Sequence, residues 1–77
     1  MSTLHLIFSS KGCERATLLA NEGDSLVLMG DAVYEINSGS YALADDLKAR
    51  GISHPQAISN SRLVELTIED DKVVSWP

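Results

Sequence analysis

The strongest constraint on the fold is a pair of short segments that are apolar on consecutive residues. These segments are Thr3–Phe8 and Ser25–Met29, and clusters of turn-forming residues separate them from the stretch between. Strands of this kind are typical of a parallel sheet that is covered on both faces, and parallel neighbours need a crossover connection. Residues Cys13–Ala20 have the apolar spacing of a short helix, for which Ser9 or Ser10 can serve as the N-cap. The sequence therefore predicts a β-α-β unit.

A second strand-to-helix step follows the first. Tyr41–Leu43 is predicted to be a third strand, and Asp46–Arg50 a short helix that is capped by Asp45 or a neighbour and stopped by Gly51. Between the two units, Ala32–Ile36 fits either one helical turn or a short strand.

The last part of the chain permits two structures. Apolar and polar residues alternate from Val64 to Glu69, which is the period-two pattern of a half-buried strand. A helix capped by Asn60 or Ser61 is the alternative, although the pattern alone favours the strand. Lys72–Trp76 is predicted to be a final edge strand, which Pro77 can end without wasting a buried donor.

The length and the cysteine content limit how such a chain can be stabilised. With 77 residues, it is expected to form a single domain over residues 1–77, and chains this short bury only about 60% of their unfolded surface. The single cysteine cannot form an internal disulfide, and His5 and His54 are too far apart for a zinc cluster. We therefore expect no metal or cofactor, and oligomerisation as the source of extra stability.

The charge and the hydropathy exclude two classes of partner. Six basic and eleven acidic side chains give a formal net charge of −5, the wrong sign for direct binding to nucleic acid. The longest apolar run, Leu26–Met29, is far shorter than the roughly 20 residues that cross a bilayer. With a single thiol and no export signal, the expected compartment is the cytoplasm.

Several short motifs are spread along nearly the whole chain. In order they are Leu4-His5, Glu22-Gly23-Asp24, Asp31, Tyr41-Ala42-Leu43, Asp46-Leu47, Ala49-Arg50-Gly51, Leu66-Thr67 and Ser75-Trp76. Together they resemble the TusB/DsrH family of sulfur-relay subunits. None of these motifs is a catalytic signature.

The resemblance implies both a fold and an assembly. The fold is DsrE-like and flavodoxin-related, an α/β structure with a parallel sheet flanked by helices, and it places a helix across residues 62–68. The partners are paralogous TusC/DsrF-like and TusD/DsrE-like subunits of a heterohexameric sulfur carrier. In the Tus branch the carrier passes persulfide sulfur toward 2-thiolation of a tRNA wobble uridine, and in the Dsr branch it serves sulfur oxidation.

The chain is also shorter than the usual member of this family. The missing material falls around residues 37–40 and 52–59, so that only Ile58 and its neighbours remain of the expected fourth strand. A truncated sheet is therefore expected.

Cys13 is the candidate catalytic residue, as a possible sulfur acceptor. It lies in the predicted first turn of a helix, where the helix dipole and Lys11 or Arg15 would favour the thiolate. The alternative is an inert, partly buried cysteine. In the family the persulfide cysteine belongs to the TusD-like subunit, and the helix cysteine of some DsrH members falls opposite Ala16, so Cys13 matches no motif position.

Two further residues have competing interpretations. His5 lies in an apolar strand with no nucleophile at triad spacing, which favours a structural hydrogen bond over acid-base catalysis. Trp76 either covers the chain's own core or docks on a partner, and the preceding valines favour the core.

The leading function is therefore a subunit of a sulfur-relay complex that has no catalytic activity alone. The competing functions are a self-sufficient thiol sulfurtransferase that uses Cys13, and a homodimeric DsrE-like binding domain.

Overall fold

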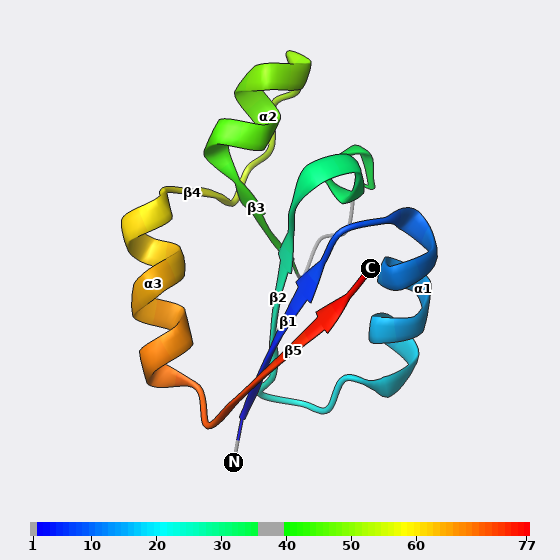
Figure 1. Cartoon of the computed structure of the whole chain (residues 1–77), viewed down its shortest axis with the longest axis vertical. Helices are drawn as coiled ribbons and strands as arrows, with labels where there is room; N and C mark the ends of the chain where they lie inside the picture. The colour runs from blue at the N-terminus through cyan, green and yellow to red at the C-terminus, as the bar shows by residue number, and fades with distance from the viewer. Residues whose placement is uncertain (1, 36–39) are drawn as a thin grey trace.

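The computed structural model describes residues 2–35 and 40–77, and within them the strands form one five-stranded parallel sheet of order β4-β3-β2-β1-β5 (Figure 1). The strands are β1 (Thr3–Ile7), β2 (Ser25–Leu28), β3 (Tyr41–Leu43), β4 (Ala57–Ile58) and β5 (Lys72–Trp76). The first strand and the last strand of the chain are therefore neighbours. β5 is an edge strand, as predicted.

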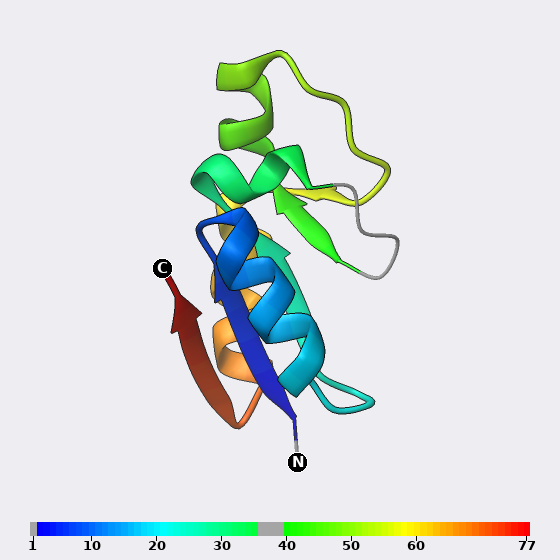
Figure 2. The same cartoon turned by 90° about the vertical axis from the view of Figure 1, so that its right-hand side faces the viewer.

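Helices cover both faces of this sheet. They are α1 (Ser10–Leu19), the 3₁₀ helix η1 (Gly30–Tyr34), α2 (Ala44–Arg50) and α3 (Asn60–Glu69). α1 lies on one face of the strands and α3 on the other (Figure 2). The predicted α/β class with a parallel sheet flanked by helices is confirmed. No helix in the described ranges has the length and apolar character needed to cross a bilayer.

Alternate strand residues supply two separate clusters of buried side chains, one on each face. The cluster beside α1, η1 and α2 contains Ile7, Cys13, Ala16, Leu28, Ala32, Val33, Ala42 and Leu47. The cluster beneath α3 contains Leu4, Val27, Ile58 and Leu66. Burial on both faces explains why β1 and β2 are apolar on consecutive residues.

The first helix begins earlier than the sequence indicated. Ser9 is its N-cap, and the Ser9 hydroxyl oxygen accepts a hydrogen bond of 3.0 Å from the backbone N–H of Gly12. The predicted N-cap Ser9 is thus confirmed, whereas the predicted start at Cys13 was too late by three residues, because Ser10 and Lys11 are exposed and carry no apolar signal.

Small residues bring this helix close to β5. Gly12 and Ala16 are buried on the sheet side, and a Cβ atom placed on Gly12 would lie 2.8 Å from the carbonyl oxygen of Trp76. Such a distance is below van der Waals contact. Glycine is therefore required at position 12 by close approach of two backbones.

The middle of the chain settles one open prediction and corrects another. Gly30–Tyr34 forms a helical turn, so the strand alternative for this segment is wrong, and Ile36 lies outside the described residues. α2 begins directly after β3 and has no side-chain cap. Asp45, a predicted cap, instead accepts a 2.8 Å hydrogen bond from Asn60. Gly51 ends α2 in the left-handed region with a φ of 65°, as predicted.

The tail is helical over Asn60–Glu69, as the family resemblance implied, and the strand suggested by alternation is wrong. The N-cap is Ser59, whose hydroxyl oxygen accepts a hydrogen bond from the N–H of Arg62. Alternation misled because Val64 and Ile68 are exposed, at 57% and 78% of their surface. The apolar residues at these two positions are therefore not part of a buried face, and their spacing does not indicate a strand.

The expected truncation is visible at the β4 edge. β4 has two residues, and no helix or strand occurs between Gly51 and Ala57. Of the other region predicted to be shortened, residues 37–39 lie outside the described residues.

The contact between Gly12 and Trp76 predicts the effect of Gly12→Ala. Helix propensity alone would make this variant more stable by about 1 kcal/mol, whereas the backbone shift needed to fit the methyl group should destabilise it by about 1–3 kcal/mol. We expect the destabilisation to dominate in urea unfolding followed by circular dichroism. Glu14→Ala, an exposed change on the same helix, is the control. A Gly12→Ala variant as stable as the wild type would contradict the close packing.

Candidate functional site

Residues from three of the motifs that carry the family resemblance are linked by consecutive hydrogen bonds. The indole N–H of Trp76 donates to Nδ1 of His5 over 3.0 Å, and Nε2 of His5 lies 3.0 Å from a carboxylate oxygen of Asp24. The His5 and Trp76 rings are also stacked, with centroids 6.1 Å apart. The three residues are far apart in sequence, in β1, in the loop before β2 and in β5. We call them the Asp24-His5-Trp76 network.

The network determines where the imidazole proton is. An indole N–H can only donate, so Nδ1 of His5 must be the acceptor. The proton of the neutral ring then lies on Nε2 and is donated to Asp24. Both ring nitrogens are therefore engaged, and the predicted structural role of His5 is the one that this geometry supports.

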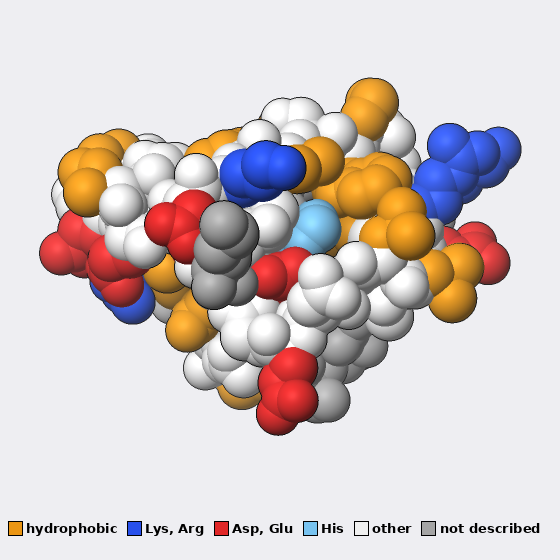
Figure 3. Space-filling view, turned by 90° about the horizontal axis from the view of Figure 1, so that it is seen from below, with side chains coloured by type: hydrophobic (Ala, Val, Ile, Leu, Met, Phe, Trp, Pro, Cys, Tyr) orange, Lys and Arg blue, Asp and Glu red, His pale blue; other side chains and the backbone are white. Residues whose placement is uncertain are grey.

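Asp24 is the electrostatic anchor of the network. Its carboxylate accepts hydrogen bonds from the backbone N–H groups of Asn21 and Thr3 as well as from His5. These bonds, that from Asn21 foremost, lower the pKa of Asp24 from 3.8 to about 2. Only 6% of the His5 side chain and 4% of the Asp24 side chain are exposed, so the pair is shielded from solvent. Figure 3 views this end of the molecule, where a histidine ring lies between carboxylates and hydrophobic side chains.

A second polar network joins other motif residues at the carboxyl ends of β2 and β3. Asp46 accepts a 2.9 Å hydrogen bond from the backbone N–H of Gly30, and Arg50 donates to Asp31 over 3.1 Å. Arg50 also donates to the carbonyl oxygen of Asp46. These bonds fasten η1 to α2. Asp46 is thus a structural acceptor.

Open α/β sheets usually bind ligands at the carboxyl ends of strands where the crossovers diverge, which here is between β1 and β5. The end of the chain occupies that place. The Ser9 hydroxyl donates to the carbonyl oxygen of Pro77, and the N–H of Phe8 donates to that of Trp76. The α1 N-terminus is therefore covered by the chain itself.

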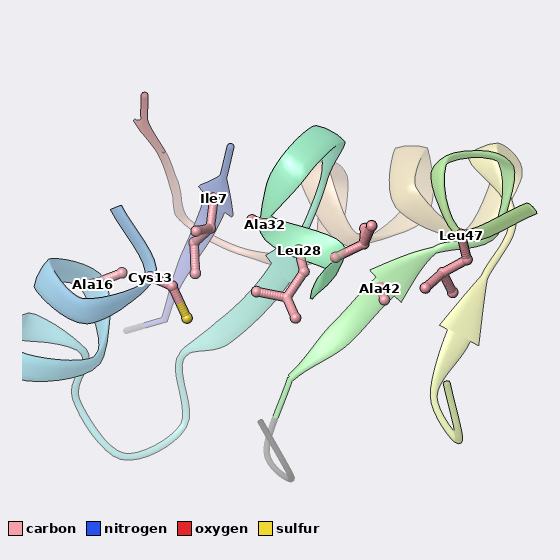
Figure 4. Close-up of a cluster of buried hydrophobic side chains, with 8 residues drawn as sticks. Ile7, Cys13, Ala16, Leu28, Ala32, Ala42 and Leu47 are labelled. Carbon is pink, nitrogen blue, oxygen red and sulfur yellow. The ribbon is translucent and has the colours of Figure 1, made fainter. Parts of the chain in front are cut away.

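Cys13 is buried, with 7% of its surface exposed, and belongs to the apolar cluster between α1 and the sheet (Figure 4). Its sulfur points toward the sheet rather than outward. The residue nevertheless lines a surface hollow of about 730 Å³ together with Lys11, Glu14, Leu18 and Glu35. Of the two predicted cationic neighbours, Lys11 lines this hollow and Arg15 does not.

Sequence reasoning missed the contact between His5 and Asp24, because no fixed spacing links a strand to a later loop. The available signal was that Leu4-His5, Glu22-Gly23-Asp24 and Ser75-Trp76 all carry the family resemblance. Residues 2–35 and 40–77 contain no group of three or more histidine, cysteine or acidic side chains that could hold a metal ion.

The pKa of Asp24 predicts an acid-sensitive part of the stability. Because the folded state holds this pKa near 2, below the ordinary 3.8, ionised Asp24 stabilises the fold above pH 3.8. That contribution is lost as the pH falls from 3.8 to about 2. We therefore expect Asp24→Asn to be less stable than the wild type at neutral pH, with a difference that shrinks across this interval. Urea unfolding at a series of pH values measures it.

Glu22→Gln, which removes an exposed carboxylate from the same loop, is the matched control and should follow the wild type. A gap between Asp24→Asn and the wild type that is the same at every pH would contradict this assignment.

Comparison with known proteins agrees with the resemblance found in the motifs. The family model described as "DsrH like protein" matches residues 7–73, which is most of the chain. A search of the curated proteins finds no significant match. Members of this family are sulfur-relay proteins that generally work with DsrE-like and DsrF-like partners. The matched segment includes Asp24 and both residues that pair with Arg50. The chain belongs to the DsrH-like family.

Proposed function

We propose that this chain is a subunit of a cytoplasmic sulfur-relay complex of the TusBCD/DsrEFH type. Its partners are one DsrE-like and one DsrF-like subunit, and the complex passes persulfide sulfur toward 2-thiolation of a tRNA wobble uridine. The chain itself contributes interface surface and has no catalytic activity alone. Family membership and the exposed apolar surface beside α3 support this function.

The α3 face of the sheet is only partly covered. Five strands span about 19 Å, whereas one helix is about 10 Å wide and covers roughly two strands. On this face Leu6, Met29 and Tyr41 are only partly buried, and Val73 of β5 is 45% exposed. A partner subunit that packs there would complete the layer.

The outer side of α3 adds further apolar surface. Val64 and Ile68 are both exposed and lie one helical turn apart, so their side chains are neighbours. A small chain with a single cysteine has no internal disulfide, so it gains stability when a partner covers such apolar surface. These observations favour assembly over independent catalysis.

The polar groups also favour a structural role. His5 uses both ring nitrogens in the Asp24-His5-Trp76 network and is not available as a general base. Cys13 is buried among aliphatic side chains. His5 therefore has no ring nitrogen left for a substrate, and the Cys13 thiol is buried except where the residue lines the hollow beside Lys11.

The α3 face can be tested with charge substitutions. Ile68→Glu and Val73→Glu place a carboxylate on the proposed interface and should weaken binding to co-expressed DsrE-like and DsrF-like subunits by about tenfold or more. Analytical size-exclusion chromatography and calorimetry of the purified complex measure this change.

Leu18→Glu is the matched control, because Leu18 is 80% exposed on α1, on the opposite face of the sheet. It should leave the complex intact. Loss of assembly in Leu18→Glu alone, or a stable homodimer that does not bind either paralogue, would refute the proposed interface.

The presence or absence of neighbouring sulfite-reductase genes separates the sulfur-oxidation branch from tRNA thiolation.

Transient sulfur transfer to Cys13 is a second candidate function, favoured by its place beside the hollow that Lys11 lines. In this step the Cys13 thiolate would attack the outer sulfur of a donor persulfide, R–S–SH. A new S–S bond would form on Cys13 while the donor S–S bond breaks, and the donor would leave as the thiolate R–S⁻. Cys13 is the fourth residue of α1, and its backbone N–H already donates to the carbonyl oxygen of Ser9, so Lys11 rather than the helix N-terminus would favour the thiolate.

Burial of Cys13 predicts that this transfer is minor. After incubation with a small persulfide donor, mass spectrometry of the folded chain should find little addition of one sulfur atom. Cys13→Ser should support tRNA thiolation in cells as the wild type does. Complete loss of thiolation in a Cys13→Ser variant that folds and assembles normally would instead establish the thiol function.

A further inference from the structure

Trp76 is held by a hydrogen bond that exists only when Nδ1 of His5 is unprotonated, because the indole N–H must donate to that atom. We propose that His5 is an acid-sensitive latch: its protonation releases the Trp76 indole and opens the surface between β5 and α1. This device belongs to the isolated chain and does not depend on the proposed function.

Protonation of His5 breaks its hydrogen bond with Trp76 and keeps its hydrogen bond with Asp24. A proton on Nδ1 would face the indole N–H, so two donors would meet over the 3.0 Å that now separates donor and acceptor. The Nε2 bond to Asp24 is retained and gains charge, since imidazolium donates to a carboxylate. The ring therefore stays with Asp24, and the indole is the group that must move.

Asp24 keeps its charge throughout the range in which this exchange occurs. Hydrogen bonds from Asn21, His5 and Thr3 hold its pKa at about 2. Imidazoles ordinarily change charge between about pH 5 and pH 8, where Asp24 remains ionised. Of the three residues in the network, only His5 then changes its charge.

The surroundings of the ring contain few other charges. Leu26 and Val74 flank His5 in register on the neighbouring strands. From α1, the buried residues are Gly12, Cys13 and Ala16, while its charged residues Lys11, Glu14 and Arg15 are exposed. A second surface hollow, separate from the one beside Cys13, is lined by Asp24 together with Asp71 and Lys72. Among the described residues, the hydrogen-bond partners of the ring are Asp24 and Trp76.

The position of Trp76 limits how far it moves. Its backbone carbonyl accepts from the N–H of Phe8 over 2.9 Å and is packed against Gly12, and neither contact involves the indole. The ring can therefore swing away while β5 stays paired with β1. The expected outcome is a local opening over the apolar cluster that Trp76 packs against, without unfolding of the sheet.

Trp76 is the single tryptophan of the chain, so its fluorescence tests the latch directly. Acidification from pH 8 to pH 5 should produce one sigmoidal red shift of the emission maximum and a rise in acrylamide quenching, with unchanged far-ultraviolet circular dichroism. His5→Asn, whose amide oxygen can accept from the indole but cannot titrate, should abolish the transition. His54→Asn should retain it.

Trp76→Phe supplies a second measurement that does not depend on how His5→Asn folds. Removal of the donor should let His5 take up its proton at higher pH than in the wild type, as followed by its C2–H resonance in NMR. An emission maximum and quenching constant that stay constant in the folded wild type, a transition that survives in His5→Asn, or a His5 titration that is identical in Trp76→Phe would each overturn the latch.

Discussion

The sheet is organised around β1, which pairs with β2 on one side and with β5 on the other. The hydrogen bond from Trp76 to His5 joins residues 71 positions apart and adds a side-chain contact to the backbone pairing of the same two strands. Contacts this distant in sequence carry a large loop-closure cost and form late or slowly. The five-stranded sheet is therefore complete only when the last strand of the chain docks beside the first. The close approach of Gly12 to Trp76 depends on that docking.

The motif residues have structural functions in both polar networks. Asp24, His5 and Trp76 join the ends of the chain, while Asp46 and Arg50 fasten α2 to η1. Neither arrangement contains a nucleophile with a base beside it, which is what independent catalysis would require. The motif residues in these networks therefore hold the fold together. This agrees with a chain whose α3 face is incompletely covered by its own helices.

The sequence predicts the parts of the fold that depend on local pattern. Continuous apolar segments located β1 and β2, and Gly51 marked the end of α2, because a left-handed residue there favours glycine. Period-two alternation failed in α3, where Val64 and Ile68 are exposed, and the family resemblance was needed to recover the helix. The site was harder to predict, since the contact of His5 with Asp24 is created by strand order rather than by spacing. Cys13 was located on α1, but its burial depends on tertiary packing.

The register of β5 against β1 is specified by polar groups as well as by apolar ones. His5 pairs in register with Val74 and Ile7 with Trp76, so both His5 and Trp76 face α1. A slip of one residue would turn Trp76 to the other face and leave the buried Nδ1 of His5 without its donor. An unsatisfied buried acceptor costs about 1–3 kcal/mol, a large fraction of the stability of a small domain. The Asp24-His5-Trp76 network therefore selects one alignment of an edge strand that has only five residues.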